Sequence, residues 1–195
     1  MSPITPSQLE IRRMRAADVG GVMAIESVSF GTHHWSEDSF LAELNNPMGR
    51  YFTLALRSPE RGGPSEQPYG HVAGYGGYWL ILDEAHITTL AVHPEYRGHS
   101  LGEALLLQLL DCCLGQTVHW VTLEVRVSNE AAQNLYYKYG FEVSGRRRRY
   151  YQDNEEDALI MTTPDIATEA FRTLFRTRKA AYVKTFAGLP QGVSV

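Results

Sequence analysis

Segments with the two-residue hydrophobic period of a strand and segments with the 3.6-residue period of a helix follow one another along most of the chain. The strand-like segments are residues 9–14, 51–56, 71–82, 84–92, 118–125, 141–151 and 158–162. The helix-like segments are residues 18–30, 101–114, 130–139 and a stretch that begins after the cap residue Ser36 and ends at Asn45-Asn46-Pro47. Two strands, 71–82 and 84–92, form a predicted hairpin that turns at Asp83. This order predicts an α/β fold with a mixed sheet (α+β), in which crossovers flank an antiparallel run.

The two ends of the chain differ from this central part. Residues 1–8 are predicted to be a flexible N-terminus, and residues 57–68 have the composition of a surface loop. From residue 164 onward, apolar side chains recur at helical spacing beside a basic face. We therefore expect a domain over residues 9–163 and a basic amphipathic helical extension over residues 164–195. The extension is expected to pack on the body; a partner surface, ribosomal RNA and an anionic membrane are the alternatives.

Charge is distributed unevenly over the 195 residues. The net charge is −4, and residues 164–195 carry five basic and two acidic side chains, which leaves −7 for the preceding part. An acidic body favours an amine or a basic peptide as the partner and opposes non-specific binding of nucleic acid. We therefore expect no direct nucleic-acid function.

The cysteines and the apolar runs indicate the compartment. Cys112 and Cys113 are adjacent in a predicted helix, where their side chains diverge, so they form no structural disulfide. The N-terminus lacks the pattern of a signal peptide, and no segment approaches the roughly 20 apolar residues that span a bilayer. A cytoplasmic protein without a membrane role is expected.

Two segments carry the chemistry. Residues 90–102 combine an apolar strand, a turn rich in small residues and the start of a leucine-striped helix, whose free N–H groups can receive an anion. Residues 123–141 form a strand that ends in a polar patch, followed by a short helix that carries tyrosines and closes on Gly140. Together they are typical of an acyl-coenzyme A site.

The turn Arg97–Gly102 resembles the coenzyme A motif of the GNAT superfamily of N-acetyltransferases. Ser100 stands where that motif has its first glycine, and a positive φ there would cost a serine roughly 1 kcal/mol. We expect this cost to be avoided, because the position can also be the first turn of a helix, where the hydroxyl could donate to the pyrophosphate.

Further segments resemble the RimI branch of the superfamily, whose members acetylate the N-terminal alanine of a small-subunit ribosomal protein. These segments are residues 33–40, 82–92, 123–129, 134–141, 148–151 and 156–161. The resemblance covers residues 9–164. It implies the GNAT fold, a central, mostly antiparallel sheet with a splayed parallel strand pair, flanked by helices.

Acetyl transfer needs a neutral amine, and an α-amino group has a pKa of about 7.7–8.0, so a base must remove a proton. The resemblance places that base at Glu124, and we expect burial beside the apolar strand to raise its pKa. A solvent-facing strand glutamate is the alternative. Tyr136 matches the proton donor to the departing thiolate, whereas Tyr137 and Tyr139 on the same helix are expected to pack in the core.

The resemblance also implies acetyl-coenzyme A as co-substrate and assigns its contacts. They are Leu90, Ala91, Val92, Arg97, Gly98, His99, Ser100, Leu101, Gly102, Glu103 and Asn129. The main chain of residues 90–92 would pair with the pantetheine arm and polarise the thioester carbonyl. The residues alone show only an apolar strand there and a helix cap at Asn129.

Substrate contacts follow from the same resemblance. Trp35, Tyr150 and Tyr151 match positions that wall the peptide groove, and Asp83 and Glu84 could pair with a basic peptide residue; each could equally be core or turn. The histidines lack the spacing of a ligand set, so we expect no metal.

The expected reaction is direct transfer from acetyl-coenzyme A to a protein N-terminus, without a covalent enzyme intermediate. A ribosomal protein with an N-terminal alanine is the favoured substrate. An acetyltransferase acting on lysine, a polyamine or an antibiotic is the first alternative, and a non-catalytic coenzyme A-binding regulatory module is the second.

Overall fold

The computed structural model describes residues 9–30, 35–56 and 71–185. The predicted flexible N-terminus, the predicted loop over 57–68 and the pair His33-His34 lie outside these residues. Within the described part, none of the helices is both long enough and apolar enough to cross a membrane.

A seven-stranded sheet in the order β1-β2-β3-β4-β5-β7-β6 forms the centre of the molecule. Its strands are β1 (Leu9–Arg13), β2 (Gly49–Leu56), β3 (Val72–Ile81), β4 (Glu84–Val92), β5 (Trp120–Arg126), β6 (Glu142–Tyr151) and β7 (Glu156–Thr162). Strands β4 and β5 pair in parallel, and the other neighbours in the sheet are antiparallel.

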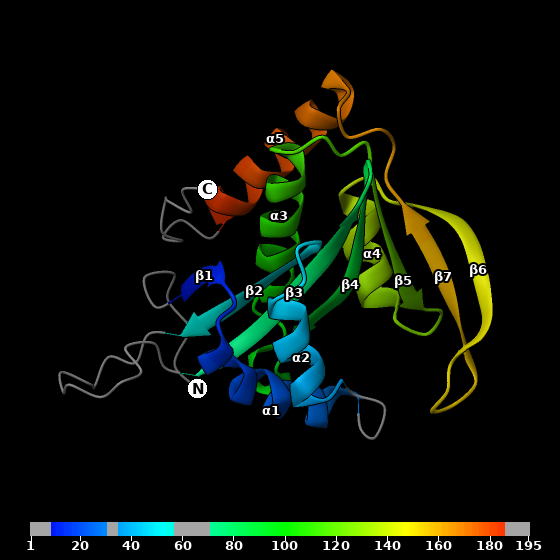
Figure 1. The fold of residues 1–195 in the computed structure, drawn as a ribbon. Coiled ribbons are helices and arrows are strands. Elements are labelled where there is room, and N and C mark those ends of the chain that lie inside the picture. The colour runs from blue at the N-terminus through cyan, green and yellow to red at the C-terminus, as the bar shows by residue number, and fades with distance from the viewer. Residues whose placement is uncertain (1–8, 31–34, 57–70, 186–195) are drawn as a thin grey trace.

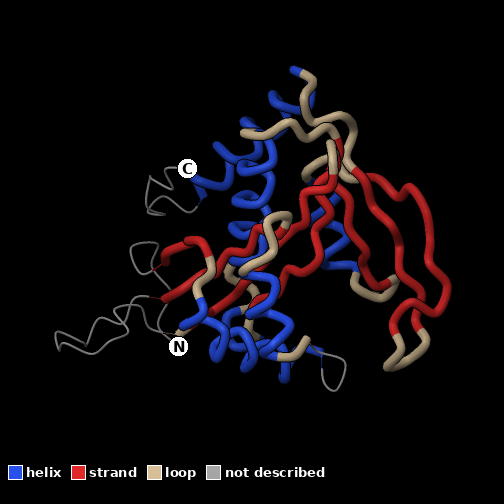
Figure 2. The backbone as a smooth tube through the Cα atoms, viewed as in Figure 1, coloured by secondary structure: helices blue, strands red, loops and turns tan. Residues whose placement is uncertain are grey.

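Helices lie on both faces of the twisted sheet (Figure 1, Figure 2). They are α1 (Val19–Phe30), α2 (Glu37–Leu44), α3 (Leu101–Leu114), α4 (Glu130–Lys138) and α5 (Glu169–Thr185). Helices α1 and α2 share one core cluster with Tyr75 of β3, and α3 shares the other with residues of β4 and β5. Gly21 lets α1 approach β3 closely, because a Cβ at this position would lie 2.7 Å from Val72 Cγ2.

Helix α5 packs on the body through the apolar side chains of its predicted stripe. Phe171 and Phe175 are 3% and 4% exposed and belong to the same core cluster as α3. Lys179 Nζ lies 2.9 Å from Asp111 Oδ2 of α3, and the Tyr182 hydroxyl donates to the carbonyl of Ser100 at 3.2 Å. The extension therefore reaches the turn that precedes α3.

The parallel pair separates half-way along β4. Pairing runs from Glu84 opposite Trp120 to Ile87 opposite Leu123, and β4 continues to Val92 without further pairing to β5. On the other side of β4, the register to β3 shifts so that Thr88 is an extra residue, a β-bulge. Because a bulge bends its strand and increases the local twist, β4 turns away from β5 at this point. The mixed sheet with a splayed parallel pair confirms the predicted fold class.

Candidate active site

Glu124 is the first residue of β5 beyond the point where β4 and β5 part. Its side chain is 8% exposed and lies between two basic side chains, with Oε2 3.0 Å from His86 Nε2 and Oε1 3.0 Å from Arg147 Nε. The hydrogen bond from His86 lowers the pKa of Glu124, aided by the charges of His86 and Arg147, and outweighs the effect of burial, which would raise it. The expectation of a raised pKa was therefore wrong. Glu124 is a fixed, ionised hydrogen-bond acceptor at the mouth of the split.

Tyr136 of α4 is buried, and its ring lies 5.6 Å from that of Phe141. Burial raises the pKa of Tyr136, so its phenol stays protonated and able to donate. Tyr139, three residues on, is 1% exposed, as expected of a core residue. Tyr137 is 47% exposed, so the expectation of core packing was wrong for it. It follows Tyr136 directly on the helix, and consecutive helical residues face different directions.

The turn before α3 contains two residues in the left-handed region, Gly98 with φ 78° and Ser100 with φ 55°. The expectation that Ser100 avoids a positive φ was wrong: it is the N-cap residue of α3, and the chain enters the helix through this left-handed residue. Its hydroxyl makes no capping hydrogen bond. A serine at this position therefore carries the conformational cost that a glycine would not.

The first turn of α3 has N–H groups to offer. Helix geometry leaves the N–H groups of Leu101, Gly102 and Glu103 without an intrahelical partner, and no side chain of the cap residue satisfies them. By contrast, Ser36 and Asn129 accept hydrogen bonds from the N–H groups of α2 and α4. The start of α3 can thus hold an anion such as a pyrophosphate.

The end of β4 faces this helix start. A Cβ built on Gly102 would lie 3.9 Å from Leu90 Cδ2 and from Val92 Cγ2, which is ordinary van der Waals contact. Glu103 turns its carboxylate to α4, where Lys138 pairs with it and the Tyr139 hydroxyl donates to it. Its contribution to an anion site is therefore its main chain.

The side chains of Arg97, His99 and Asn129, three other residues assigned to the coenzyme, are held by contacts within the protein. Arg97 Nε donates to the carbonyl of Val92 at 3.0 Å, and its Nη2 donates to Ser29 Oγ of α1 at 3.1 Å. His99 Nδ1 lies 2.9 Å from the carbonyl oxygen of Arg97. Asn129 Oδ1 accepts from the N–H of Ala132, so its observed role is the cap of α4.

The residues assigned to the peptide groove come from two parts of the chain. The ring of Trp35, just before α2, lies 5.2 Å from the ring of Phe40, and the main-chain N–H of Trp35 donates to the Glu26 carboxylate at 2.8 Å. Tyr150 and Tyr151 of β6 form an edge-to-face pair with centroids 5.2 Å apart. Burial raises the pKa of Tyr150, and the charge of the nearby Glu124 carboxylate raises it further.

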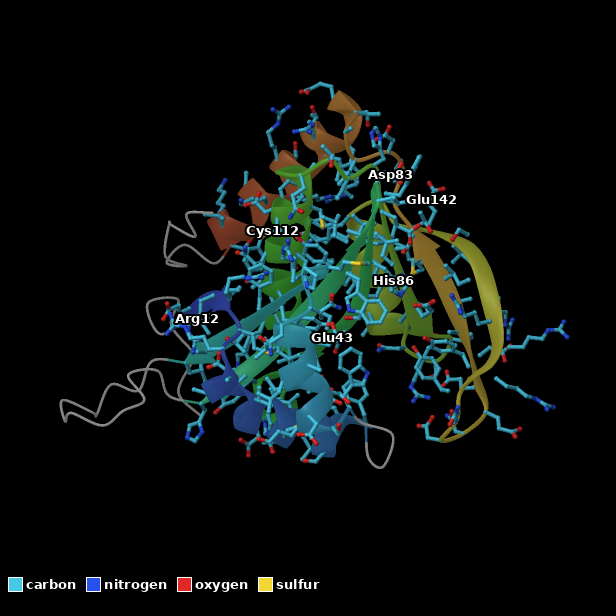
Figure 3. All side chains as sticks on the ribbon, in the orientation of Figure 1. Arg12, Glu43, Asp83, His86, Cys112 and Glu142 are labelled. Carbon is cyan, nitrogen blue, oxygen red and sulfur yellow. The ribbon has the colours of Figure 1, made fainter. Side chains whose placement is uncertain are left out.

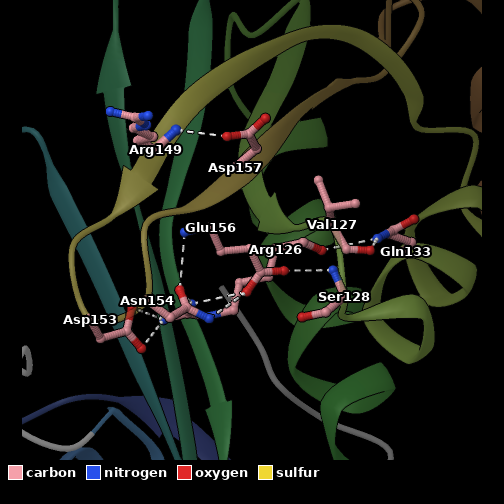
Figure 4. A network of polar contacts seen from close by, with 9 residues as sticks. All are labelled: Arg126, Val127, Ser128, Gln133, Arg149, Asp153, Asn154, Glu156 and Asp157. Atoms are coloured by element: carbon pink, nitrogen blue, oxygen red, sulfur yellow. Dashed lines mark hydrogen bonds and ion pairs between the residues drawn. The ribbon is translucent and has the colours of Figure 1, made fainter.

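Arg126 fixes the hairpin that carries these tyrosines (Figure 4). Its guanidinium binds Asp153 at 2.9 Å and Glu156 at 3.1 Å, and lies 3.8 Å from the centre of the Tyr151 ring. Hydrogen bonds from Ser128 are the main cause that lowers the pKa of Glu156 to about 2. This network was not predicted from the sequence, where its signal is an arginine in one motif segment and acidic residues beside another.

His86 of β4 is the second functional candidate that was not predicted from the sequence. Figure 3 labels this residue, which lies next to Glu124 and, on the other side of its ring, 2.8 Å from Thr122 Oγ1. Glu84 accepts from Thr122 Oγ1 at 2.6 Å, and Asp83 lies at the hairpin turn, at the opposite end of β4 from the split. Neither acidic residue lines the opening between the strands.

Covalent and metal chemistry find no support among the described residues. Cys112 and Cys113 are free, and burial raises the pKa of both thiols, which disfavours a thiolate nucleophile. Residues 9–30, 35–56 and 71–185 contain no group of three or more His, Cys, Asp or Glu side chains placed to hold a metal ion.

Both the sequence and the fold match known proteins. Residues 26–141 match the Acetyltransferase (GNAT) family. The chain is 44% identical over 152 residues to the putative [ribosomal protein bS18]-alanine N-acetyltransferase of Bacillus subtilis, covering 77% of this chain and 92% of that protein. It is 37% identical over 132 residues to the [ribosomal protein bS18]-alanine N-acetyltransferase of Escherichia coli, covering 67% and 80%. The crystal structure of the Escherichia coli ribosomal-protein-S18-alanine N-acetyltransferase matches with a TM-score of 0.66 at 32% identity, covering 83% of this chain and 97% of that one.

Proposed function

Because the chain belongs to the GNAT family of acetyltransferases and is a RimI-like member of it, we propose that it acetylates the N-terminal alanine of ribosomal protein bS18. The relatives that carry this activity in their names cover most of the chain, and the opening beside Glu124 supports transfer to an amine. GNAT enzymes use acetyl-coenzyme A, and the uncapped start of α3 fits its pyrophosphate. A ribosomal-protein substrate would place the enzyme in the cytoplasm.

In this proposal the parted end of β4 orients the thioester. The main-chain N–H groups of residues 88–92 that face the split are free of pairing to β5. They can pair with the pantetheine arm and donate to the carbonyl oxygen, whose negative charge grows as the amine attacks. Turn residues 97–103 hold the pyrophosphate, with Asn129 at the start of α4 beside the arm.

Two side chains complete the proton balance. The amine nitrogen forms a bond to the carbonyl carbon and loses a proton towards Glu124, directly or through a water molecule. The carbon–sulfur bond then breaks, and Tyr136 donates its phenol proton to the departing thiolate. Trp35, Tyr150 and Tyr151 wall the peptide. The single observation that carries this proposal is the position of Glu124, buried and ionised, at the split between β4 and β5.

The test is acetylation of short peptides that differ in the first residue. The bS18 N-terminal peptide should be acetylated with a higher kcat/KM than a lysine-only acceptor or spermidine. Glu124→Gln should lower kcat by roughly 10²–10⁴-fold with unchanged coenzyme A affinity, because a positioned base contributes about that much. Preference for spermidine would replace the proposal with a polyamine acetyltransferase, and binding of acetyl-coenzyme A without turnover of any acceptor would indicate a non-catalytic module.

A further inference from the structure

Four polar side chains form a continuous chain across the paired part of β4 and β5. In spatial order they are Glu84, Thr122, His86 and Glu124. The three contacts measure 2.6 Å, 2.8 Å and 3.0 Å between their nitrogen or oxygen atoms. His86 and Thr122 are register partners in the parallel pair, which fixes the middle contact. This series of hydrogen-bonded side chains ends at the carboxylate of Glu124, which is proposed as the base.

The hydrogen atoms available for these three contacts can be counted. Thr122 has one hydroxyl proton, and it donates that proton to Glu84 Oε1. Its oxygen must therefore accept from His86, so Nδ1 of the ring carries a hydrogen atom. The other ring nitrogen, Nε2, faces the Glu124 carboxylate at 3.0 Å. An unprotonated nitrogen and a carboxylate oxygen are both acceptors, so this contact requires a proton between them.

We propose that His86 and Glu124 act as one base, which takes up the proton of the attacking amine, and that Thr122 and Glu84 hold the histidine in the tautomer this requires. The inference rests on the proposed function. The observed 3.0 Å contact is that of the pair with its shared proton. To act as a base the pair first loses this proton to solvent, which leaves Nε2 and the carboxylate oxygen as two acceptors. The proton that the amine loses enters between them and restores the 3.0 Å contact; it leaves to solvent after the product departs. His86 is 24% exposed and Glu124 8%, so solvent reaches the pair from the histidine side.

This arrangement resolves the conflict between the lowered pKa of Glu124 and its role as a base. A carboxylate alone is a weak base, because efficient proton transfer requires a proton affinity near the operating pH. The imidazole of His86 beside the carboxylate is a second group that can hold the proton. The other charged or titratable groups around the pair are Arg147, Tyr150 and Tyr151 of β6 and Glu84 of β4. On the β3 side, Trp79 is the register partner of His86 and donates its ring N–H to Glu43 of α2.

His86→Gln tests the proposal, because glutamine retains a donor for Glu124 but cannot take up a proton. We expect kcat to fall about tenfold or more with an unchanged KM for acetyl-coenzyme A. In the parent, kcat/KM should fall at low pH through two steps, one from the peptide amine and one from the pair. The variant should retain only the step of the amine. His119→Gln is the matched control, since this histidine binds Asp165 at the other end of β5 and should leave both kcat and the pH profile unchanged.

Thr122→Val is a second variant, nearly isosteric, that removes the hydroxyl linking Glu84 to His86. It should lower kcat several-fold, and ¹⁵N NMR of labelled histidine should show His86 protonated at Nδ1 in the parent and no longer held in that form in the variant. An unchanged pH profile in His86→Gln, or a Nε2–H tautomer in the parent, would overturn the inference. If the parent acetylates the peptide and Glu124→Gln does not, these outcomes leave the proposed function standing; if the parent acetylates no N-terminal peptide, the proposed function itself fails.

Discussion

Replacement of Ser100 by glycine should stabilise the protein. Ser100 has φ 55° and ψ 22°, and its hydroxyl makes no capping hydrogen bond, so the substitution removes no helix-capping hydrogen bond. The left-handed conformation costs an L-residue about 1–2 kcal/mol, and glycine does not bear this cost. Against this, the greater freedom of glycine in the unfolded chain costs about 0.4–1 kcal/mol. The net gain should be about 0.5–1 kcal/mol, or an increase in Tm of about 1–4 °C for a chain of this size.

Urea denaturation and thermal melting measure this difference directly. Ser100→Ala is the matched control, because alanine also lacks the hydroxyl but keeps the Cβ and therefore the conformational cost. The free energy of unfolding should rank glycine above serine, with alanine close to serine. Acetylation of the bS18 peptide should stay within a few-fold of the parent for Ser100→Gly. A glycine variant no more stable than the alanine variant would refute the claim that the turn carries strain.

Three further substitutions and one truncation test the cofactor turn, the acid and the extension. Gly102→Ala should leave the KM for acetyl-coenzyme A within a few-fold of the parent, since its Cβ meets the end of β4 at ordinary contact distance. Gly102→Val should raise the KM for acetyl-coenzyme A more than the KM for the peptide. Equal effects of the valine on both KM values would indicate misfolding. Tyr136→Phe should lower kcat and keep the parent melting temperature, because only a hydroxyl is lost, and unchanged turnover would exclude the phenol as the acid. Truncation before Pro164 should lower Tm, since α5 buries three aromatic side chains worth about 1.5–3 kcal/mol each. It should also raise the KM for acetyl-coenzyme A a few-fold, because the Tyr182 hydroxyl no longer holds the carbonyl of Ser100, and a truncated protein with the parent KM would contradict this link.

The positions of most helices and strands could be predicted because local signals agree with the tertiary structure. Helix α3 begins at Leu101 and ends at Leu114 as predicted, because a leucine stripe and the following glycine mark both its face and its end. Strand β7 begins earlier than predicted, at Glu156, because Tyr151 pairs with Glu156 where the β6–β7 hairpin closes. Such pairing depends on the partner strand and leaves no periodic signal in its own segment.

The chemistry of Glu124 shows why site residues are harder to predict than elements. Its burial can be expected from the neighbouring apolar residues, but its pKa depends on His86 and Arg147, which reach it from β4 and β6. Those strands lie far apart in the sequence, and their order in the sheet sets which side chains meet. A family motif identifies the carboxylate, and only the sheet topology identifies the groups that determine its charge.

The bulge in β4 does leave a signal in the sequence. Ala85 and Ile87 belong to the core cluster beneath α3, and the next apolar residue packed against that cluster is Leu90. Strict alternation would place this residue two positions after Ile87, but it lies three positions after it. The two residues skipped, Thr88 and Thr89, both bond to tyrosine hydroxyls, those of Tyr51 and Tyr75, which belong to the cluster with α1 and α2. Because side chains of a strand alternate between faces, a three-residue step indicates one inserted residue. The same insertion turns β4 away from β5 and leaves the main chain that we propose to hold the acetyl group without pairing to β5. The shift in hydrophobic phase at residues 87–90 therefore marks the proposed site before any catalytic side chain is assigned.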